Sequence, residues 1–136
     1  MKEASVLDLC CGTGAFGLEA LSRGASHCTF VDVRTDYVKK NVQMAERGTY
    51  KVIKAKSENI VEKFDEKFDI IFIDPPYGKI NPYEMIKKIC ENEILASDGV
   101  LIYEESVRTD FSYPEKVELD AEKKYGDTKI YYLSVI

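Results

Sequence analysis

Tryptophan is absent from the 136-residue sequence, and histidine occurs once, at His27. The sequence also has no apolar run of about 18 residues, the length that a membrane-spanning helix needs, and its N-terminus lacks the charged-then-apolar order of a signal peptide. We therefore expect a cytoplasmic protein with no membrane partner. The four cysteines include no CxxC pair and have no histidine cluster beside them, so we expect reduced, mostly buried thiols and no metal site.

An excess of positive charge is also missing, since 19 Lys and Arg face 24 Asp and Glu and the net charge is −5. This balance argues against a protein that binds nucleic acid through bulk positive charge, although a local basic patch stays open. The composition, 45% hydrophobic and 32% charged, is that of a soluble globular chain. At this length we expect a single domain over residues 1–136, without room for a separate substrate domain.

Short apolar runs alternate with helical patterns along the chain, which is typical of βαβ units and a parallel sheet covered on both faces. Five runs indicate strands, over residues 4–9, 28–32, 51–55, 68–74 and 100–104. Two more, 117–123 and 129–135, are joined through residues 125–127 and indicate a hairpin. The sequence therefore predicts an α/β fold with a doubly wound, Rossmann-like, seven-stranded and mostly parallel sheet that ends in a C-terminal antiparallel hairpin. Such sheets bind ligands at the carboxyl ends of the strands, beside the first one.

Two of the predicted helices have clear boundary signals. One lies between a Thr35 cap and a terminating Gly48, with apolar residues at helical spacing, namely Val38, Val42 and Ala45. The other begins at Asn81, which is followed by a proline at the first helical position and a glutamate at the third.

A glycine-rich segment, residues 8–17, lies where the first strand turns into the first helix and matches the pattern G-x-G-x-x-G. Gly12 and Gly14 allow a tight turn and a close approach of the backbone to a ligand. The pattern suits the pyrophosphate of a dinucleotide or the methionine and ribose parts of S-adenosylmethionine, and a purely structural turn is a third possibility. Asp32 ends the second strand, where a carboxylate can accept both hydroxyls of a ribose. Asp8 favours S-adenosylmethionine, because its charge would repel a pyrophosphate but suits a cationic amino-acid end; capping of the loop amides is the alternative.

The most specific motif is Asp74-Pro75-Pro76-Tyr77, directly after the buried run 68–73. Its two prolines stiffen the turn and withhold two backbone donors, so carbonyl groups can face a ligand. The exocyclic amine of a nucleobase is a poor nucleophile, because its lone pair is delocalised into the ring. Hydrogen bonds from that amine to the Asp74 carboxylate and the Pro75 carbonyl would orient the lone pair, and Tyr77 offers a face for an unstacked base. A rigid turn with a half-buried tyrosine is the alternative.

The chain resembles a known family at this point. Its motif, together with VLDLCCGTGAFGLEALSRGA, DIIFIDPPYGK, LIYEES and KKYGDT, is similar to the bacterial RsmD-type 16S ribosomal RNA guanine-N2 methyltransferases over residues 6–136. The resemblance implies the class I methyltransferase fold, S-adenosylmethionine as cofactor, and methylation of a guanine N2 in 16S rRNA, of the guanine 966 type, with the rRNA or the small ribosomal subunit as partner. By matched motif it implies that the cofactor is held by Asp8, Gly12, Gly14 and Asp32 and the base by Asp74, Pro75 and Tyr77.

Two features depart from the family pattern. The family has a further segment before the first strand, with a basic hairpin and an Arg-Pro-Thr motif, whereas this sequence begins almost at that strand, so we expect a methyltransferase domain without the usual N-terminal extension. At the third strand end such enzymes place an Asn or Asp beside a small residue to contact adenine, and Lys56-Ser57 stands there instead. We expect Ser57 to cap the next helix while backbone groups meet the adenine. The further cofactor contacts that we predict at these loop and strand ends are Cys10, Val33 and Ser57.

Basic side chains near the predicted site are candidates for RNA contacts. The turn of the C-terminal hairpin should lie at the same sheet edge as Asp74, because the sixth strand runs parallel to the first five. The residues predicted to bind the substrate are Pro76, Lys79, Arg108 and Lys124. Ordinary solvated lysines are the alternative, and Glu104 and Glu105 either line the pocket or are solvated acids.

Three other functions stay open from the sequence. An adenine-N6 methyltransferase shares the Asp-Pro-Pro-Tyr motif but usually carries a separate recognition region, for which this chain has no room. A catalytically silent S-adenosylmethionine-fold module in ribosome assembly is favoured by the missing extension and disfavoured by Asp74 and Tyr77. A nicotinamide enzyme is least favoured, because neither a substrate domain nor a catalytic acid or base is visible.

Overall fold

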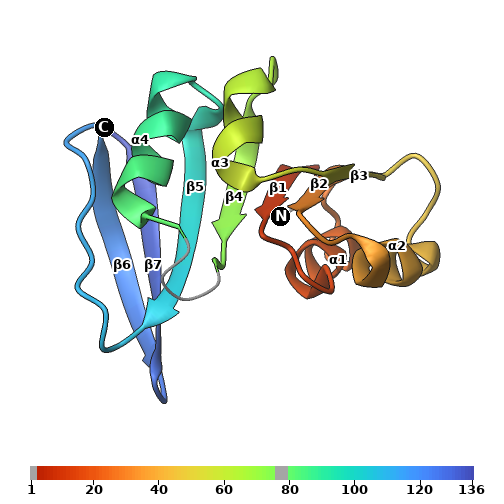
Figure 1. The fold of residues 1–136 in the computed structure, drawn as a ribbon. Helices are drawn as coiled ribbons and strands as arrows, with labels where there is room; N and C mark the ends of the chain where they lie inside the picture. Colours follow the sequence, from red (N-terminus) through yellow and green to blue (C-terminus); the bar gives the residue numbers. More distant parts are fainter. Residues whose placement is uncertain (1–2, 76–79) are drawn as a thin grey trace.

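The computed structural model describes residues 3–75 and 80–136. Its seven strands form one sheet in the order β3-β2-β1-β4-β5-β7-β6 (Figure 1). The strands are β1 (Ser5–Leu9), β2 (His27–Asp32), β3 (Tyr50–Lys54), β4 (Phe68–Ile73), β5 (Leu95–Ser106), β6 (Val117–Tyr125) and β7 (Thr128–Val135). The helices are α1 (Ala15–Ser22), α2 (Asp36–Asn41), α3 (Ser57–Ile60) and α4 (Pro82–Glu91), with 3-10 turns η1 (Val42–Met44) and η2 (Val61–Lys63). In the described parts of the chain no helix is long and apolar enough to cross a membrane.

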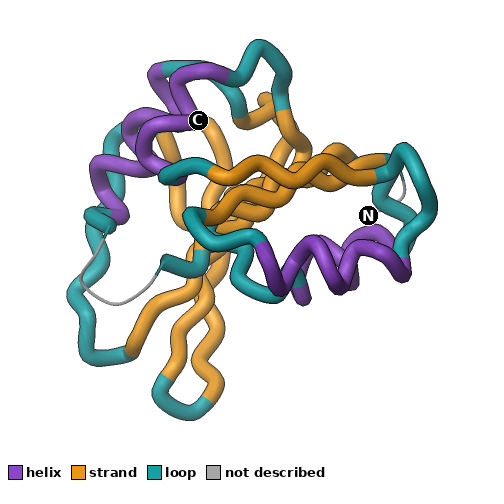
Figure 2. The backbone as a smooth tube through the Cα atoms, turned by 45° about the vertical axis from the view of Figure 1, so that its right-hand side comes forward, coloured by secondary structure: helices purple, strands orange, loops and turns teal. Residues whose placement is uncertain are grey.

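Helices cover both faces of the sheet, as Figure 2 shows. Alternate residues of β1 serve the two faces, since side chains of a strand point to opposite sides in turn. Val6 belongs to the apolar cluster under α1 and α2, together with Phe30. Leu7 and Leu9 belong to the cluster under α3, η2 and α4. The doubly wound fold predicted from the sequence is therefore confirmed, and Asp8, between Leu7 and Leu9, lies on the α1 side.

The C-terminal hairpin continues the sheet beyond β5. Strands β1 to β5 pair in parallel, whereas β7 pairs antiparallel with both β5 and β6. Strand β6 therefore runs parallel to the first five strands, and the turn between β6 and β7 lies at the edge where their carboxyl ends meet. In Figure 1 this turn is the lowest point of the molecule. The predicted antiparallel hairpin and its position at this edge are both confirmed.

The helix after β2 is shorter than its periodicity predicts. Helix α2 ends at Asn41, the turn η1 follows, and Ala45 is already extended with φ −89° and ψ 157°. Val42 is nevertheless buried, so the apolar spacing identified the inner face but not the end. Thr35 is at the predicted N-cap position, but its φ of −117° and ψ of 5° lie outside the β region of capping residues, and its side chain makes no cap hydrogen bond.

The predicted start of α4 is confirmed, whereas β5 is longer than expected. Asn81 Oδ1 accepts a hydrogen bond from Glu84 N at 3.3 Å, and Pro82 is the first helical residue. Strand β5 begins at Leu95, before Gly99, where the register with β4 shifts. A Cβ at Gly99 would lie 2.8 Å from the Asp69 carbonyl oxygen, so glycine lets the strand pass this irregularity without a clash.

Candidate functional site

A tight loop joins β1 to α1 at the carboxyl edge of the sheet. Three of its residues have a left-handed backbone, namely Cys10 (φ 57°), Gly12 (φ 56°) and Gly14 (φ 82°). Hydrogen bonds run from Cys11 N to the Val31 carbonyl at 3.0 Å and from Gly14 N to the Cys11 carbonyl at 2.8 Å. A Cβ at Gly12 would meet no atom within 4 Å, so glycine there permits the turn and leaves the space in front of it open.

The other two glycines of the motif serve close packing. A Cβ at Gly14 would lie 2.7 Å from Val38 Cγ2, and a Cβ at Gly17 would collide with the Phe30 ring. Helix α1 can therefore approach β2 and α2 closely only with glycine at these positions. Gly14 is not among the described residues that line the cleft at this edge, whereas Gly12 lines it.

Asp32, at the end of β2, holds the glycine loop in place. Its Oδ2 accepts a hydrogen bond from Gly12 N at 2.7 Å, and its Oδ1 accepts from Val33 N at 2.7 Å and Arg34 N at 3.3 Å. Both Asp32 and Val33 line the cleft, and Val33 is 57% exposed. The end of β2 therefore presents a fixed carboxylate beside an exposed apolar side chain.

Asp8 is a buried carboxyl group in the wall of the same cleft, with 1% of its surface exposed. Its Oδ2 accepts a hydrogen bond from Gly17 N at 3.1 Å, whereas its Oδ1 has no partner among the described residues. Burial raises the pKa of Asp8 to about 7 against the opposing effect of the Gly17 hydrogen bond, and the charges of Asp74 and Asp32 raise it further. A cation in the cleft would satisfy Oδ1 and favour the ionised form.

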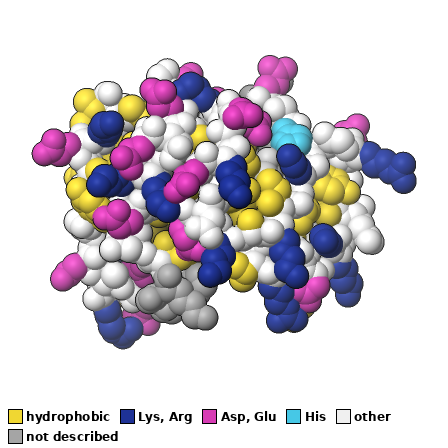
Figure 3. Space-filling view, turned by 45° about the horizontal axis from the view of Figure 1, so that its top comes forward, with side chains coloured by type: hydrophobic (Ala, Val, Ile, Leu, Met, Phe, Trp, Pro, Cys, Tyr) yellow, Lys and Arg dark blue, Asp and Glu magenta, His cyan; other side chains and the backbone are white. Residues whose placement is uncertain are grey.

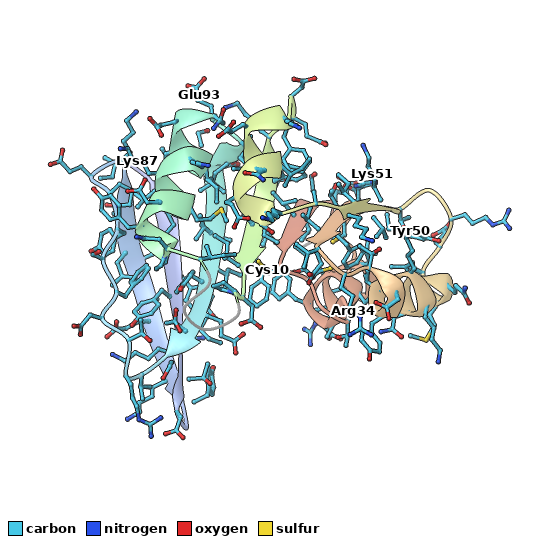
Figure 4. All side chains as sticks on the ribbon, in the orientation of Figure 1. Cys10, Arg34, Tyr50, Lys51, Lys87 and Glu93 are labelled. Carbon is cyan, nitrogen blue, oxygen red and sulfur yellow. The ribbon has the colours of Figure 1, made fainter. Side chains whose placement is uncertain are left out.

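The cleft has a volume of about 1210 Å³ and opens at the carboxyl ends of the strands. It exceeds the roughly 300–1,000 Å³ of most small-molecule pockets, so it has room for two ligands side by side. Cys10, labelled in Figure 4, lies beside the end of β4 at this edge. The predicted site residues that the structure brings together in the lining are Asp8, Cys10, Gly12, Asp32, Val33, Ser57, Asp74 and Pro75.

Carboxyl groups gather where β4 and β5 end. Asp74, Glu104 and Glu105 all line the cleft. Partial burial raises the pKa of Asp74 to about 6, and the charges of Glu104 and then Glu105 add to that rise. Glu105 is anchored, since its Oε2 accepts a hydrogen bond from the Tyr103 hydroxyl and its Oε1 accepts from Ser106 N at 2.9 Å. Asp74 is still mostly ionised at pH 7 and can accept hydrogen bonds there.

Ser57 does not cap the helix after β3, which corrects the prediction. Lys56 is at the N-cap position, and Ser57 is the first residue of α3. The buried Ser57 Oγ lies 3.4 Å from Cys10 Sγ, within hydrogen-bond distance, so the serine bridges to the glycine loop instead of bonding helix amides. Burial raises the pKa of the Cys10 thiol to about 11, although the Ser57 hydrogen bond opposes that rise, so Cys10 is a neutral group of the lining.

Two phenylalanines form an apolar part of the lining that the sequence analysis missed. The rings of Phe16 and Phe72 are stacked, with centroids 4.1 Å apart and planes inclined by 6°, and both line the cleft. Phe72 lies two residues before Asp74, so strand alternation could have placed it on the same face. No comparable local signal exists for Phe16, because its position depends on how α1 packs on the sheet.

The structure describes the positions of some of the predicted substrate contacts and not of others. Arg108 and Lys124 are exposed and do not line the cleft. Thr128, which does, pairs with Ser106 and with Tyr125, so the hairpin turn stands beside the cleft. The predicted contacts Pro76, Tyr77 and Lys79 lie outside the described residues.

Among the described residues, the lining of the cleft is richer in acidic than in basic side chains. On the face of the molecule drawn in Figure 3, basic and acidic side chains are interspersed. Residues 3–75 and 80–136 contain no group of three or more His, Cys, Asp or Glu side chains that could hold a metal ion. The described lining of the cleft offers a ligand carboxyl groups, backbone groups and apolar side chains.

A family model described as conserved hypothetical protein 95 matches residues 1–134. The chain belongs to this family. YlbH of Bacillus subtilis, named a candidate rRNA methyltransferase, is 35% identical over 107 residues, covering 72% of the chain and 57% of the relative. Ribosomal RNA small subunit methyltransferase D of Escherichia coli is 28% identical over 128 residues, covering 91% and 65%. The chain thus spans less than two thirds of the length of these two relatives. Its resemblance to the RsmD-type methyltransferases is confirmed.

Solved structures share the fold. YhhF of Escherichia coli, named a candidate methyltransferase, superposes with a TM-score of 0.90 at 26% identity, over 99% of this chain and 79% of YhhF. SMU.776, a candidate methyltransferase in complex with S-adenosylhomocysteine, superposes with a TM-score of 0.77 at 17% identity, over 98% and 46%. The class I methyltransferase fold predicted from the sequence is confirmed.

Proposed function

We propose that this chain is the S-adenosylmethionine-dependent methyltransferase domain of a cytoplasmic rRNA-modifying enzyme, and that it methylates the exocyclic N2 of a guanine in 16S rRNA, of the guanine 966 type. The observation that carries the proposal is that Asp8, Asp32, Asp74 and Pro75 line one and the same cleft. The relatives named as rRNA methyltransferases support the substrate class. The fold alone would not support a substrate class, since one fold hosts many functions.

The glycine-loop end of the cleft suits S-adenosylmethionine. The partnerless Oδ1 of Asp8 can take the cationic amino-acid end, directly or through water. The Asp32 carboxylate, fixed by Gly12 and Val33 amides, is at the strand end where ribose hydroxyls are accepted. Val33 offers an apolar face for the adenine. Binding of S-adenosylhomocysteine by a neighbour of the same fold supports this assignment.

The other end of the cleft suits the nucleophile. When bound, S-adenosylmethionine supplies a methyl group on a positively charged sulfur, and the electron pair of the broken carbon–sulfur bond stays on sulfur while the new carbon–nitrogen bond forms. The Asp74 carboxylate and the Pro75 carbonyl accept the two N–H groups of the guanine amine and aim its lone pair at the methyl carbon. The amine loses one proton as it gains the methyl group. With a pKa of about 6, an Asp74 oxygen can take that proton and pass it to water. Tyr77, predicted to stack on the base, completes the proposal.

Replacing Asp74 tests the mechanism. Asp74→Ala should lower methyl transfer to small ribosomal subunits by a factor of about 100 or more, because the amine loses its charged acceptor. S-adenosylhomocysteine affinity, measured by calorimetry, should stay near that of the parent protein. The matched control is Asp65→Ala, an exposed acid that does not line the cleft. Full turnover by Asp74→Ala would show that the motif does not orient the nucleophile.

A further inference from the structure

Asp74 and Glu104 end neighbouring strands side by side. Strands β4 and β5 run parallel with Ile73 paired to Tyr103, so the next residues along, Asp74 and Glu104, are level with each other. Neighbouring strands lie about 4.8 Å apart, and level residues of a parallel pair project to the same face. Both carboxylates line the cleft, and Glu104 is the charge that raises the pKa of Asp74 most. The carboxylates of Asp74 and Glu104 are therefore two hydrogen-bond acceptors on one wall of the cleft, carried by neighbouring strands.

The neighbouring acid, Glu105, is engaged differently. Both of its carboxylate oxygens already accept hydrogen bonds, from the Tyr103 hydroxyl and from Ser106 N. The structure records no hydrogen bond or ion pair of the Glu104 carboxylate with any other described residue, and this side chain is partly exposed in the cleft. Glu104 is thus the acid that can receive a donor from a ligand held at Asp74.

The chemistry of the base edges decides which ligand suits this pair. On guanine, the N1–H donor is next to the N2 amine, so a base whose N2 amine binds Asp74 and Pro75 turns a second donor toward the neighbouring strand. Adenine turns an acceptor, N1, toward the same place beside its N6 amine. A carboxylate there would hydrogen-bond guanine and face the lone pair of adenine unfavourably.

We propose that Glu104 is a specificity-determining residue, whose carboxylate accepts the N1–H of the target guanine and rejects adenine. The proposal rests on the proposed function and deepens it, because it gives a physical reason for guanine-N2 over adenine-N6 transfer. The carboxylates of Asp74 and Glu104 also repel a phosphate group. The base edge therefore enters the site while the sugar–phosphate backbone of the RNA stays outside it. Glu104 contacts the base and plays no part in holding the cofactor.

The experiment uses 2-aminopurine, a base with the same N2 amine but an unprotonated N1. Small ribosomal subunits are reconstituted on 16S rRNA that carries guanine or 2-aminopurine at the target position, and methyl transfer to each is measured. The variant Glu104→Gln presents an amide N–H₂ group, which can donate to the N1 of 2-aminopurine. The control is Glu118→Gln, an exposed acid on β6 that does not line the cleft.

The parent protein should prefer guanine to 2-aminopurine by about tenfold or more, the worth of one good base contact. Glu104→Gln should reduce that preference by about the same factor, whereas the Glu118→Gln control keeps it. The S-adenosylhomocysteine dissociation constant of Glu104→Gln should equal that of the parent.

Two results would overturn the proposal while the proposed function stands. In one, Glu104→Gln slows transfer to both bases equally. In the other, its S-adenosylhomocysteine affinity falls by the same factor as its activity, which makes Glu104 a cofactor contact. If the parent protein methylates neither RNA, or methylates adenine N6 instead, the proposed function fails and this inference fails with it.

Discussion

At the scale of single residues, the buried Asp8 carboxylate lowers the stability of the free protein but supplies a negative charge for ligand binding. Its carboxyl group is almost fully buried with one partnerless oxygen, and burial raises its pKa to about 7. The pKa of an unfolded Asp is about 3.9, so the folded chain binds the extra proton between these two values. Its contribution to stability is therefore fully present below about pH 4 and is lost as the pH rises to about 7.

Asp8→Asn should consequently stabilise the apo protein at high pH. At pH 8 we expect a gain of a few kcal/mol in the free energy of unfolding, because a neutral amide replaces a buried charge. The gain should disappear near pH 4, and S-adenosylhomocysteine affinity should fall at pH 8. Denaturant unfolding at both pH values measures the first effect, with exposed Asp65→Asn as the control. Equal stability of Asp8→Asn and the parent at pH 8 would contradict this account.

Single residues of the site were predictable where a motif coincides with a strand end. Asp8, Asp32 and Asp74 line one cleft because the carboxyl ends of parallel strands meet at one edge, which the alternation of strands and helices already indicates. Ser57 was misjudged because its partner, Cys10, is distant in sequence and adjacent only in the fold. The orphaned oxygen of Asp8 likewise depends on burial, which no local pattern reveals.

At the scale of elements, the junction between α1 and β2 is packed very closely. A Cβ at Gly17 would meet the Phe30 ring and Cys28 Sγ, both of which are buried in the core. The glycine is therefore needed for packing, and through packing for the position of the loop that precedes the helix.

Gly17→Ala should lower the free energy of unfolding by about 1–3 kcal/mol, the usual cost of overpacking a dense core. In a Phe30→Leu background, where the aromatic ring is gone, the same substitution should cost less, with a coupling energy of roughly 0.5–3 kcal/mol. Urea unfolding of the four proteins of this double-mutant cycle gives that energy. Equal costs in both backgrounds would show that Phe30 does not require the glycine.

The elements themselves were largely predictable, and their ends were not. Apolar runs and helical spacing located the seven strands and the inner face of α2, because burial sets both patterns. The end of α2 depends on more than its own residues, since Asn41 Nδ2 donates to the Thr13 carbonyl at 2.9 Å and ties the helix to the glycine loop. The early start of β5 depends on a register shift against β4.

At the scale of the whole molecule, a net charge of −5 limits where RNA can be held. The hairpin turn stands beside the cleft, and exposed Lys124 precedes this turn in the chain. Exposed Arg108 follows Val107, whose N donates to the Asp127 carbonyl of the turn at 2.9 Å. We propose these two side chains as phosphate contacts that hold the RNA while a base enters the acidic cleft. Overall repulsion makes such local contacts the main attraction for the RNA.

Arg108→Glu with Lys124→Glu should therefore weaken binding to 16S rRNA. The slope of log affinity against log salt should also become shallower by about 0.7–0.9 for each phosphate that is no longer neutralised. Filter binding over a salt series measures both quantities. The control is Lys87→Glu on α4, which Figure 4 labels well away from the hairpin turn. An effect no larger than that of the control would mean that the hairpin edge does not contact phosphate.

The central claim is tested most directly by methyl transfer from radiolabelled S-adenosylmethionine to unmodified small ribosomal subunits, followed by digestion of the RNA and identification of the labelled nucleoside. The account predicts that the label is in N2-methylguanosine and that Asp74→Ala lowers it by a factor of about 100 or more. Label in N6-methyladenosine, or no label in the RNA, would contradict it.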